Sequence, residues 1–164
     1  MRVLGVDPGL GRTGYAVVDG SAGRLRLIDA GRLDTTPDMD VGARLVALAE
    51  MLGTVIAGCA PDAAAVEQLF FSTNRRTAMQ VAEARGVILF AVAHAGIPVA
   101  EYTPAQVKQA VCGYGGADKR QVARMTQALL ALEGTRDDVA DACAIAVCHH
   151  HRARLSAVLQ AAGW

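Results

Sequence analysis

The sequence predicts an α/β fold built on one mixed, five-stranded sheet whose first three strands are antiparallel. Apolar residues alternate with polar ones, or run in short blocks, up to Leu33, as strands require. From Val41 the apolar residues recur at helical spacing instead. Helical and strand-like segments then follow in the order α-β-α-β-α-α-α, which a single sheet covered by helices accommodates most simply.

Short connections predict that the first three strands form an antiparallel meander. Gly9 and Gly11 lie in the first turn and supply backbone geometry that a Cβ would oppose. Leu25 and Leu27 alternate with charged residues, as they do in a half-exposed strand. The three strands are expected at residues 2–7, 13–19 and 24–33.

The remaining elements follow from start and stop residues. Asp38 or Asp40 is a suitable N-cap for the first helix, and Pro104 suits the first turn of a later, short one. A short strand ends at Glu67. Long helices are expected from residue 41 to a stop at 59–62, over about 74–95, and over about 137–154. A further helix is expected at 118–132, and the last strand at 97–102.

Length and composition describe a single globular domain. We expect a domain at 1–154 and a short C-terminal tail at 155–164. The chain is 52% hydrophobic and 20% charged, which argues against disorder. Charged residues interrupt each apolar run before the roughly 18 residues of a membrane span, and the N-terminus lacks a signal-peptide pattern. The four cysteines form no CxxC pair, so we expect free thiols in a reducing cytosol.

The charge distribution gives a first indication of a partner. The net charge is zero, yet seven Lys and Arg face only three Asp and Glu between Phe70 and Thr126. This basic middle is compatible with a phosphate-binding face, and equally with solvated helix charges.

Four carboxylates lie where a metal site could form. Asp7 and Glu67 each close an apolar strand, which places them at the carboxyl edge of the sheet. Asp138 and Asp141 are three residues apart and share one helix face. If the four meet, their charge requires raised pKa values or bound cations, and we favour cations. A structural turn at Asp7 and helix capping at Asp138 are the alternatives.

Three further motifs have competing interpretations. Phe70 and Phe71 precede Arg75 and Arg76, an arrangement that suits stacking on unpaired bases, although either ring could anchor its loop in the core. Lys119 follows a glycine-rich loop, but no Gly directly precedes it and no Ser or Thr follows it, so we reject a P-loop. The tract 149–151 consists of three histidines whose side chains diverge on a helix, which favours a structural or surface role over metal binding.

Taken together, these motifs resemble the RuvC family of Holliday-junction resolvases, which carry an RNase H-like fold with helices on both faces of the sheet. The resemblance runs from Val3 to about His150. The matching segments are GVDPG with RTGY, Ala65-Val66-Glu67-Gln68 with Phe70, Ala84-Arg85-Gly86-Val87, Gln106-Val107-Lys108-Gln109, the Gly113–Val122 loop and helix start, and Asp138-x-x-Asp141 with its Ala-rich continuation.

The resemblance implies that the four acids are catalytic and bind two Mg²⁺ ions, with Mn²⁺ as a substitute. Carboxylates are hard ligands suited to these ions. In a two-metal scheme Asp7 would bridge the ions, Glu67 and Asp141 would lie on opposite sides, and Asp138 would help to hold the water-bearing ion. The residues expected to contact DNA are Phe70, Arg75, Arg76, Lys108, Lys119 and Arg120.

The resemblance further implies a structure-selective endonuclease that resolves four-way junctions in homologous recombination and DNA repair. Paired symmetric nicks would leave 5′-phosphate and 3′-hydroxyl ends. It implies a homodimer formed through the helix at about 74–95, cooperation with a branch-migration complex (RuvA and RuvB), and a bacterial cytoplasmic setting without a membrane. The alternative is a related RNase H-like nuclease that processes structured RNA. An actin-like ATPase would need a larger chain, and a non-cutting junction-binding protein would have no use for four retained acids.

Overall fold

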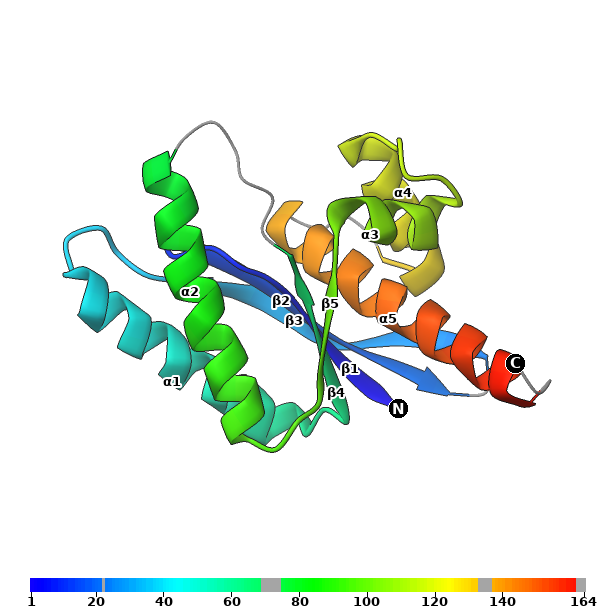
Figure 1. The fold of residues 1–164 in the computed structure, drawn as a ribbon, viewed down its shortest axis with the longest axis horizontal. Coiled ribbons are helices and arrows are strands. Elements are labelled where there is room, and N and C mark those ends of the chain that lie inside the picture. Colours follow the sequence, from blue (N-terminus) through cyan, green and yellow to red (C-terminus); the bar gives the residue numbers. More distant parts are fainter. Residues whose placement is uncertain (22, 69–74, 133–136, 162–164) are drawn as a thin grey trace.

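A computed structural model describes residues 1–21, 23–68, 75–132 and 137–161. Within them, five strands and five helices follow one another in the order that the sequence predicts (Figure 1). The strands are β1 (Arg2–Asp7), β2 (Arg12–Ser21), β3 (Arg24–Asp34), β4 (Ala63–Glu67) and β5 (Val99–Tyr102). The helices are α1 (Val41–Cys59), α2 (Arg75–His94), α3 (Pro104–Cys112), α4 (Lys119–Leu130) and α5 (Asp137–Ala161).

The strands form one mixed sheet in the order β3-β2-β1-β4-β5, which confirms the predicted fold class. The meander β1-β2-β3 is antiparallel, and β4 and β5 continue from β1 in parallel. Asp7 pairs with Gly14, and Gly14 pairs with Arg32. These three residues therefore form a row across the sheet at the edge where β1 ends.

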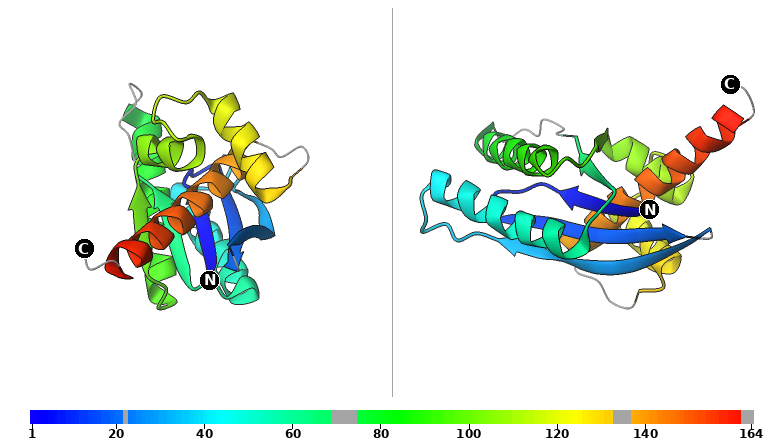
Figure 2. Two further views of the ribbon diagram at one scale, coloured as in Figure 1. Left: turned by 90° about the vertical axis from the view of Figure 1, so that its right-hand side faces the viewer. Right: turned by 90° about the horizontal axis from the view of Figure 1, so that it is seen from below.

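Helices cover both faces of the sheet (Figure 2). One core layer joins β1, β2 and β4 to α1 and α2 through residues such as Leu4, Leu48 and Ile88. The other joins the same strands to α3, α4 and α5, with Val18 and Ile145 fully enclosed. The small side chains of α5 let this long helix lie close along the middle of the sheet.

Two glycines allow that close approach. A Cβ on Gly5 would collide with the carbonyl oxygen of Ala142, and one on Gly14 would collide with that of Asp138. Any larger residue would push α5 away from the sheet. Gly14 in particular brings the first turn of α5 down onto β2, beside Asp7 on the neighbouring strand.

Local capping explains several boundaries. Asp40 is the N-cap of α1, and its carboxylate accepts a hydrogen bond from the Ala43 amide at 2.9 Å. Thr103 and Gln106 form a capping box at α3. Gly9 does permit a tight turn, because a Cβ there would collide with the Arg12 carbonyl oxygen, whereas a Cβ on Gly11 would meet only the flexible end of Arg44.

Several boundaries differ from expectation; β2, for example, spans Arg12–Ser21 rather than residues 13–19. β5 begins at Val99 rather than at residue 97, because the chain before it is still a connection whose Pro98 carbonyl accepts from the Ala64 amide. α4 ends at Leu130, where Ala131 adopts a left-handed cap. α5 continues past Arg154 to Ala161, since no glycine or proline interrupts that stretch. The division into a domain and a tail stays a prediction.

Among the described residues, α1 alone has the length and apolar composition of a membrane span. It carries Arg44 and Glu50, however, and Leu48 and Leu52 are completely buried beneath the sheet. The helix therefore packs on the sheet through one face, and its length and composition alone are weak evidence of a membrane span.

Candidate active site

Three elements bring the four predicted acids to one edge of the sheet. Asp7 ends β1 and Glu67 ends β4, and these parallel neighbours finish at the same edge. Asp138 and Asp141 occupy the first turns of α5, which Gly14 holds close above β2. All four side chains are partly buried.

The carboxylates sense one another electrostatically. Burial raises the pKa of Asp7 to about 7, and the negative charges of Glu67, Asp141 and Asp138 add to this rise. Burial also raises the pKa of Glu67, with Asp141 as the next cause, while Lys108 and Lys119 oppose the shift. Mutual repulsion of this kind disfavours full ionisation unless positive charge is supplied.

Lysine side chains supply part of that charge. The ammonium of Lys119 lies 3.0 Å from Oδ2 of Asp141 and 3.8 Å from Oδ2 of Asp137. The hydrogen bond to Asp141 raises the pKa of Lys119. Lys119 and Lys108 line a cavity of about 250 Å³ together with Glu67 and Asp141, over a floor that includes Val107 and Val122.

The donor set fits a hard divalent cation. Every candidate ligand is a carboxylate oxygen, as Mg²⁺ and Mn²⁺ prefer, and negative charge is in excess. In the part of the chain that the structure describes, no three His, Cys, Asp or Glu side chains are close enough to cage an ion as they stand. Asp141 is instead held by Lys119, whose ammonium lies 3.0 Å from its Oδ2. Binding an ion therefore requires the side chains to rotate.

Arg32 is a site residue that sequence reasoning missed. Its guanidinium binds both oxygens of Asp34, at 2.7 and 2.8 Å, and lies 3.8 Å from Oδ2 of Asp138. The strand pairing in the structure reveals its place, because it aligns Arg32 with Gly14 and Asp7. Asp138 is thus flanked by a fixed positive charge on the β3 side.

The predicted DNA-contacting residues divide by position. Lys108 and Lys119 belong to the acid cluster, and Arg120 is exposed beside Lys119 in the first turn of α4. Phe70 lies outside the described residues. Arg75 and Arg76 begin α2, but their side chains also lie outside what the structure describes.

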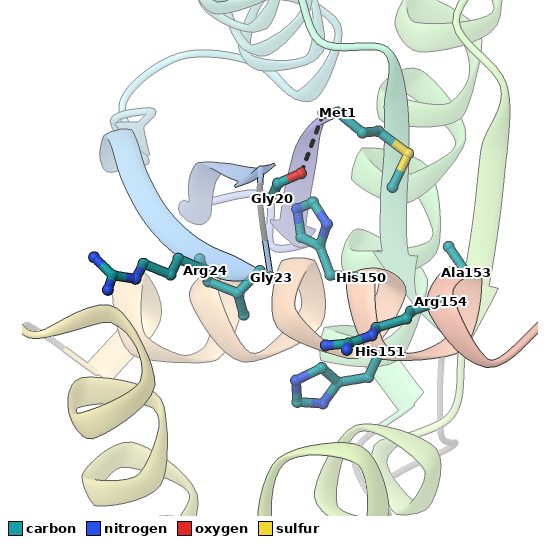
Figure 3. A pocket seen from close by; sticks show the side chains of 9 residues that line it. Met1, Gly20, Gly23, Arg24, His150, His151, Ala153 and Arg154 are labelled. Carbon is teal, nitrogen blue, oxygen red and sulfur yellow. Dashed lines mark hydrogen bonds between the residues drawn. The ribbon is translucent and has the colours of Figure 1, made fainter. Parts of the chain in front are cut away.

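The histidine tract is structural, as expected. Nδ1 of His149 lies 2.9 Å from the Tyr102 hydroxyl, and Nε2 of His150 lies 2.9 Å from the Val18 carbonyl oxygen. Nδ1 of His151 lies 2.9 Å from the Ala110 carbonyl oxygen. Figure 3 shows His150 directed toward Gly20 and His151 turned away from it. The hollow drawn there lies at the start of β1, opposite the acids. The four cysteines are free thiols.

Known proteins similar to this chain agree on one family. The family model described as crossover junction endodeoxyribonuclease RuvC matches residues 3–149. A protein of that name from Syntrophomonas wolfei is 48% identical over 162 residues, covering 98% of this chain and 94% of the relative. Another from Chloroflexus aggregans is 52% identical over 155 residues, covering 93% of this chain and 94% of the relative.

Solved structures agree with the sequence relatives. Thermus thermophilus RuvC, in complex with a Holliday junction substrate, superposes with a TM-score of 0.89 at 36% identity, covering 95% of this chain and 96% of that one. The yeast mitochondrial Holliday junction resolvase Ydc2 shares the fold, with a TM-score of 0.70 at 16% identity and coverage of 94% and 82%. Sequence, fold and the clustered acids therefore converge, and the chain belongs to the RuvC family of crossover junction endodeoxyribonucleases, a metal-dependent class of nuclease.

Proposed function

We propose that this protein resolves four-way DNA junctions by metal-dependent hydrolysis of phosphodiester bonds, with the acid cluster as its active site. The observation that carries the proposal is the clustering of four partly buried carboxylates at one sheet edge, where burial and mutual repulsion raise the pKa of Asp7. That edge adjoins a cavity lined by Lys108 and Lys119, which suits a phosphate. Family membership supports the choice of substrate.

Asp7, Glu67, Asp138 and Asp141 would hold two Mg²⁺ ions, with Mn²⁺ able to replace them. When bound, such ions supply a Lewis acid for the phosphoryl oxygen and lower the pKa of a coordinated water. Cleavage on this scheme leaves 5′-phosphate and 3′-hydroxyl ends.

The chain's own cations position the substrate. Lys119 is bonded to Asp141, so it can exchange that carboxylate for a phosphate oxygen without leaving the site. Lys108 lines the same cavity, near Glu67. The apolar floor formed by Val107 and Val122 lowers the local dielectric constant, which strengthens the attraction between each ammonium and the phosphate. Phe70, Arg75, Arg76 and Arg120 would extend the DNA surface.

The exposed face of α2 supports a homodimer. Met79 is 66% exposed and Phe90 is 67% exposed, the two highest values among the exposed large apolar residues of the described chain. Phe90 stacks on His94 and borders a shallow apolar hollow shared with Ile56 of α1. Two opposed nicks require two active sites, which a pair of chains joined through this face would provide. Cooperation with a RuvA and RuvB branch-migration complex in the bacterial cytoplasm belongs to the same proposal.

A cleavage assay tests the substrate. The protein is incubated with a synthetic four-way junction, a linear duplex of the same sequence and a structured RNA, with Mg²⁺ or with EDTA. We expect paired nicks in the junction only, dependent on Mg²⁺, with ends that DNA ligase can rejoin. Cleavage of the RNA with an intact junction would establish the RNA-processing alternative instead.

Sedimentation tests the dimer independently. Phe90→Glu places a charge in the exposed apolar face and should convert a dimer to a monomer. Met125→Glu is the matched control, because Met125 is also exposed but lies on α4. If both variants and the parent chain sediment as dimers, α2 is excluded as the interface.

A further inference from the structure

We propose that a second basic hollow, on the β3 side of the acids, binds a backbone phosphate of the junction DNA. The strand to be cut would then be held on both sides of the acid cluster. The inference rests on the proposed function and deepens it, because it assigns DNA binding to residues beyond Lys108 and Lys119.

The hollow forms where three segments meet at the catalytic edge. Its lining comes from the turn after β1, the end of β3 with the residues that follow, and the first turn of α1. It encloses about 360 Å³, which is room for a phosphate group with its water. The lining residues that matter here are Gly11, Arg12, Arg32, Asp34, Thr35 and Arg44.

Positive charge dominates this lining. Three guanidinium groups face a single carboxylate, and Arg32 already binds both oxygens of that carboxylate, Asp34. Arg12 and Arg44 are therefore not neutralised by Asp34. An excess of two positive charges in a concave surface attracts anions.

Arg44 is held in a fixed orientation. Its Nε donates a hydrogen bond to the Thr35 hydroxyl at 2.9 Å, and that hydroxyl donates in turn to the Leu10 carbonyl oxygen. A guanidinium has five N–H donors, so its terminal nitrogens keep donors for a ligand. A Cβ on Gly11 would lie 3.4 Å from Nη2 of Arg44, so the missing side chain leaves room for a ligand beside that nitrogen. A planar guanidinium fixed in this way suits a phosphate.

The hollow lies within reach of the strand that occupies the active site. Arg32 is two strands from Asp7 in the row through Gly14, a separation of about 10 Å at the usual strand spacing. Lys108 and Lys119 lie on the opposite, β4 side of the acids. Cations thus flank the acid cluster on both sides, and a DNA strand that crosses the acids would bring successive phosphates over both.

Arg12→Gln tests the proposal, because Arg12 is exposed and its loss leaves the Thr35 and Asp34 contacts in place. Arg26→Gln is the matched control: Arg26 is also an exposed arginine in the meander, but it pairs with Asp19 at the opposite end of the sheet. Arg12→Lys keeps the charge. Junction affinity of the full chain is measured in EDTA over a series of KCl concentrations, after melting curves have verified that each variant is folded.

Each lost phosphate contact reduces the slope of log affinity against log salt by about 0.9. We expect that reduction for Arg12→Gln, a parental slope for Arg26→Gln, and a largely restored slope for Arg12→Lys. A parental slope for Arg12→Gln would overturn the role of the hollow while leaving the proposed function intact. Failure of the parent chain to prefer the junction over duplex would instead overturn the proposed function itself.

Discussion

The start of α5 and the histidine tract at 149–151 each carry three titratable side chains, but their surroundings differ. At its start, Asp138 and Asp141 face other carboxylates, and their charges help to raise the pKa of Asp7. Further along, His149 and His150 each meet a hydrogen-bonding partner from a strand. The histidines complete the packing of the fold, whereas the acids repel one another.

Burial acts on both groups, so burial alone does not separate function from structure. It lowers the pKa of His149 and of His150, which favours their neutral forms, and it raises the pKa of Asp7 and Glu67. The difference lies in the neighbours. A neutral histidine with one hydrogen-bonding partner is satisfied. A cluster of acids, in contrast, ionises fully only when a positive charge binds beside it. The following changes should separate these two situations.

Asp7→Asn should have the largest effect, on activity. Loss of the most strongly perturbed carboxylate should reduce junction cleavage in Mg²⁺ by more than about 100-fold, since losing even an indirect partner of a metal ligand costs roughly 10–100-fold. Junction binding should remain, because the proposed phosphate contacts come from lysines and arginines rather than from Asp7. Cleavage rate and binding are measured on the same junction, with the exposed Glu50→Gln on α1 as a control. Near-parental cleavage would remove Asp7 from the active site.

The same substitution should change how stability depends on pH. The folded pKa of Asp7, about 7, exceeds its ordinary value of 3.8, so the folded state holds the proton more tightly. Ionised Asp7 therefore destabilises the fold progressively between those values and fully above the upper one. In EDTA, the parent chain should lose stability relative to Asp7→Asn as pH rises through this window, and Mg²⁺ should reverse the loss. Parallel melting temperatures at all pH values would show that neither burial nor the neighbouring acids raise the pKa of Asp7.

His150→Ala should have the opposite effect to Asp7→Asn: it should lower the stability of the fold and leave the cleavage rate unchanged. The imidazole is buried, bonds the Val18 carbonyl and packs against Gly20. Its removal leaves a buried carbonyl oxygen without that partner, at a cost of about 1–3 kcal/mol in the free energy of unfolding. Denaturant titration measures the loss, and cleavage per folded molecule should match the parent. His151→Ala, at an exposed position, should cost less. A cleavage defect in folded His150→Ala would join the histidines to the active site.

The sequence was sufficient to place Asp7 and Glu67 at one edge, because strand ends and element order are local signals. It also favoured the shared face of Asp138 and Asp141. What it could not provide was the close contact of α5 with the sheet, since the need for glycine at positions 5 and 14 depends on a helix more than a hundred residues away.

Arg32 escaped prediction for a different physical reason. The alternation of Leu25 and Leu27 would assign Arg32 to the face opposite those leucines. A bulge at Ile28 reverses the alternation, so that Ala30 packs on the α5 side and Arg32 reaches Asp138. One inserted residue therefore decides on which face of the sheet Arg32 lies, and no local propensity in the sequence predicts that insertion.

Tyr102→Phe should have the smallest effect. It tests the comparison between the acids and the histidines at a residue that neighbours both groups. Tyr102 pairs in the sheet with Glu67, yet its hydroxyl contacts His149, so it lies between the two groups. Removing the hydroxyl should lower the free energy of unfolding by about 0.5–1.5 kcal/mol without changing cleavage. Tyr114→Phe is the control, because that hydroxyl bonds Gln121 at an exposed position and should cost less. If Tyr102→Phe slows cleavage at unchanged stability, the Tyr102 hydroxyl contributes to the proposed active site. His149, its partner on α5, would then belong to that site and not only to the packing of the fold.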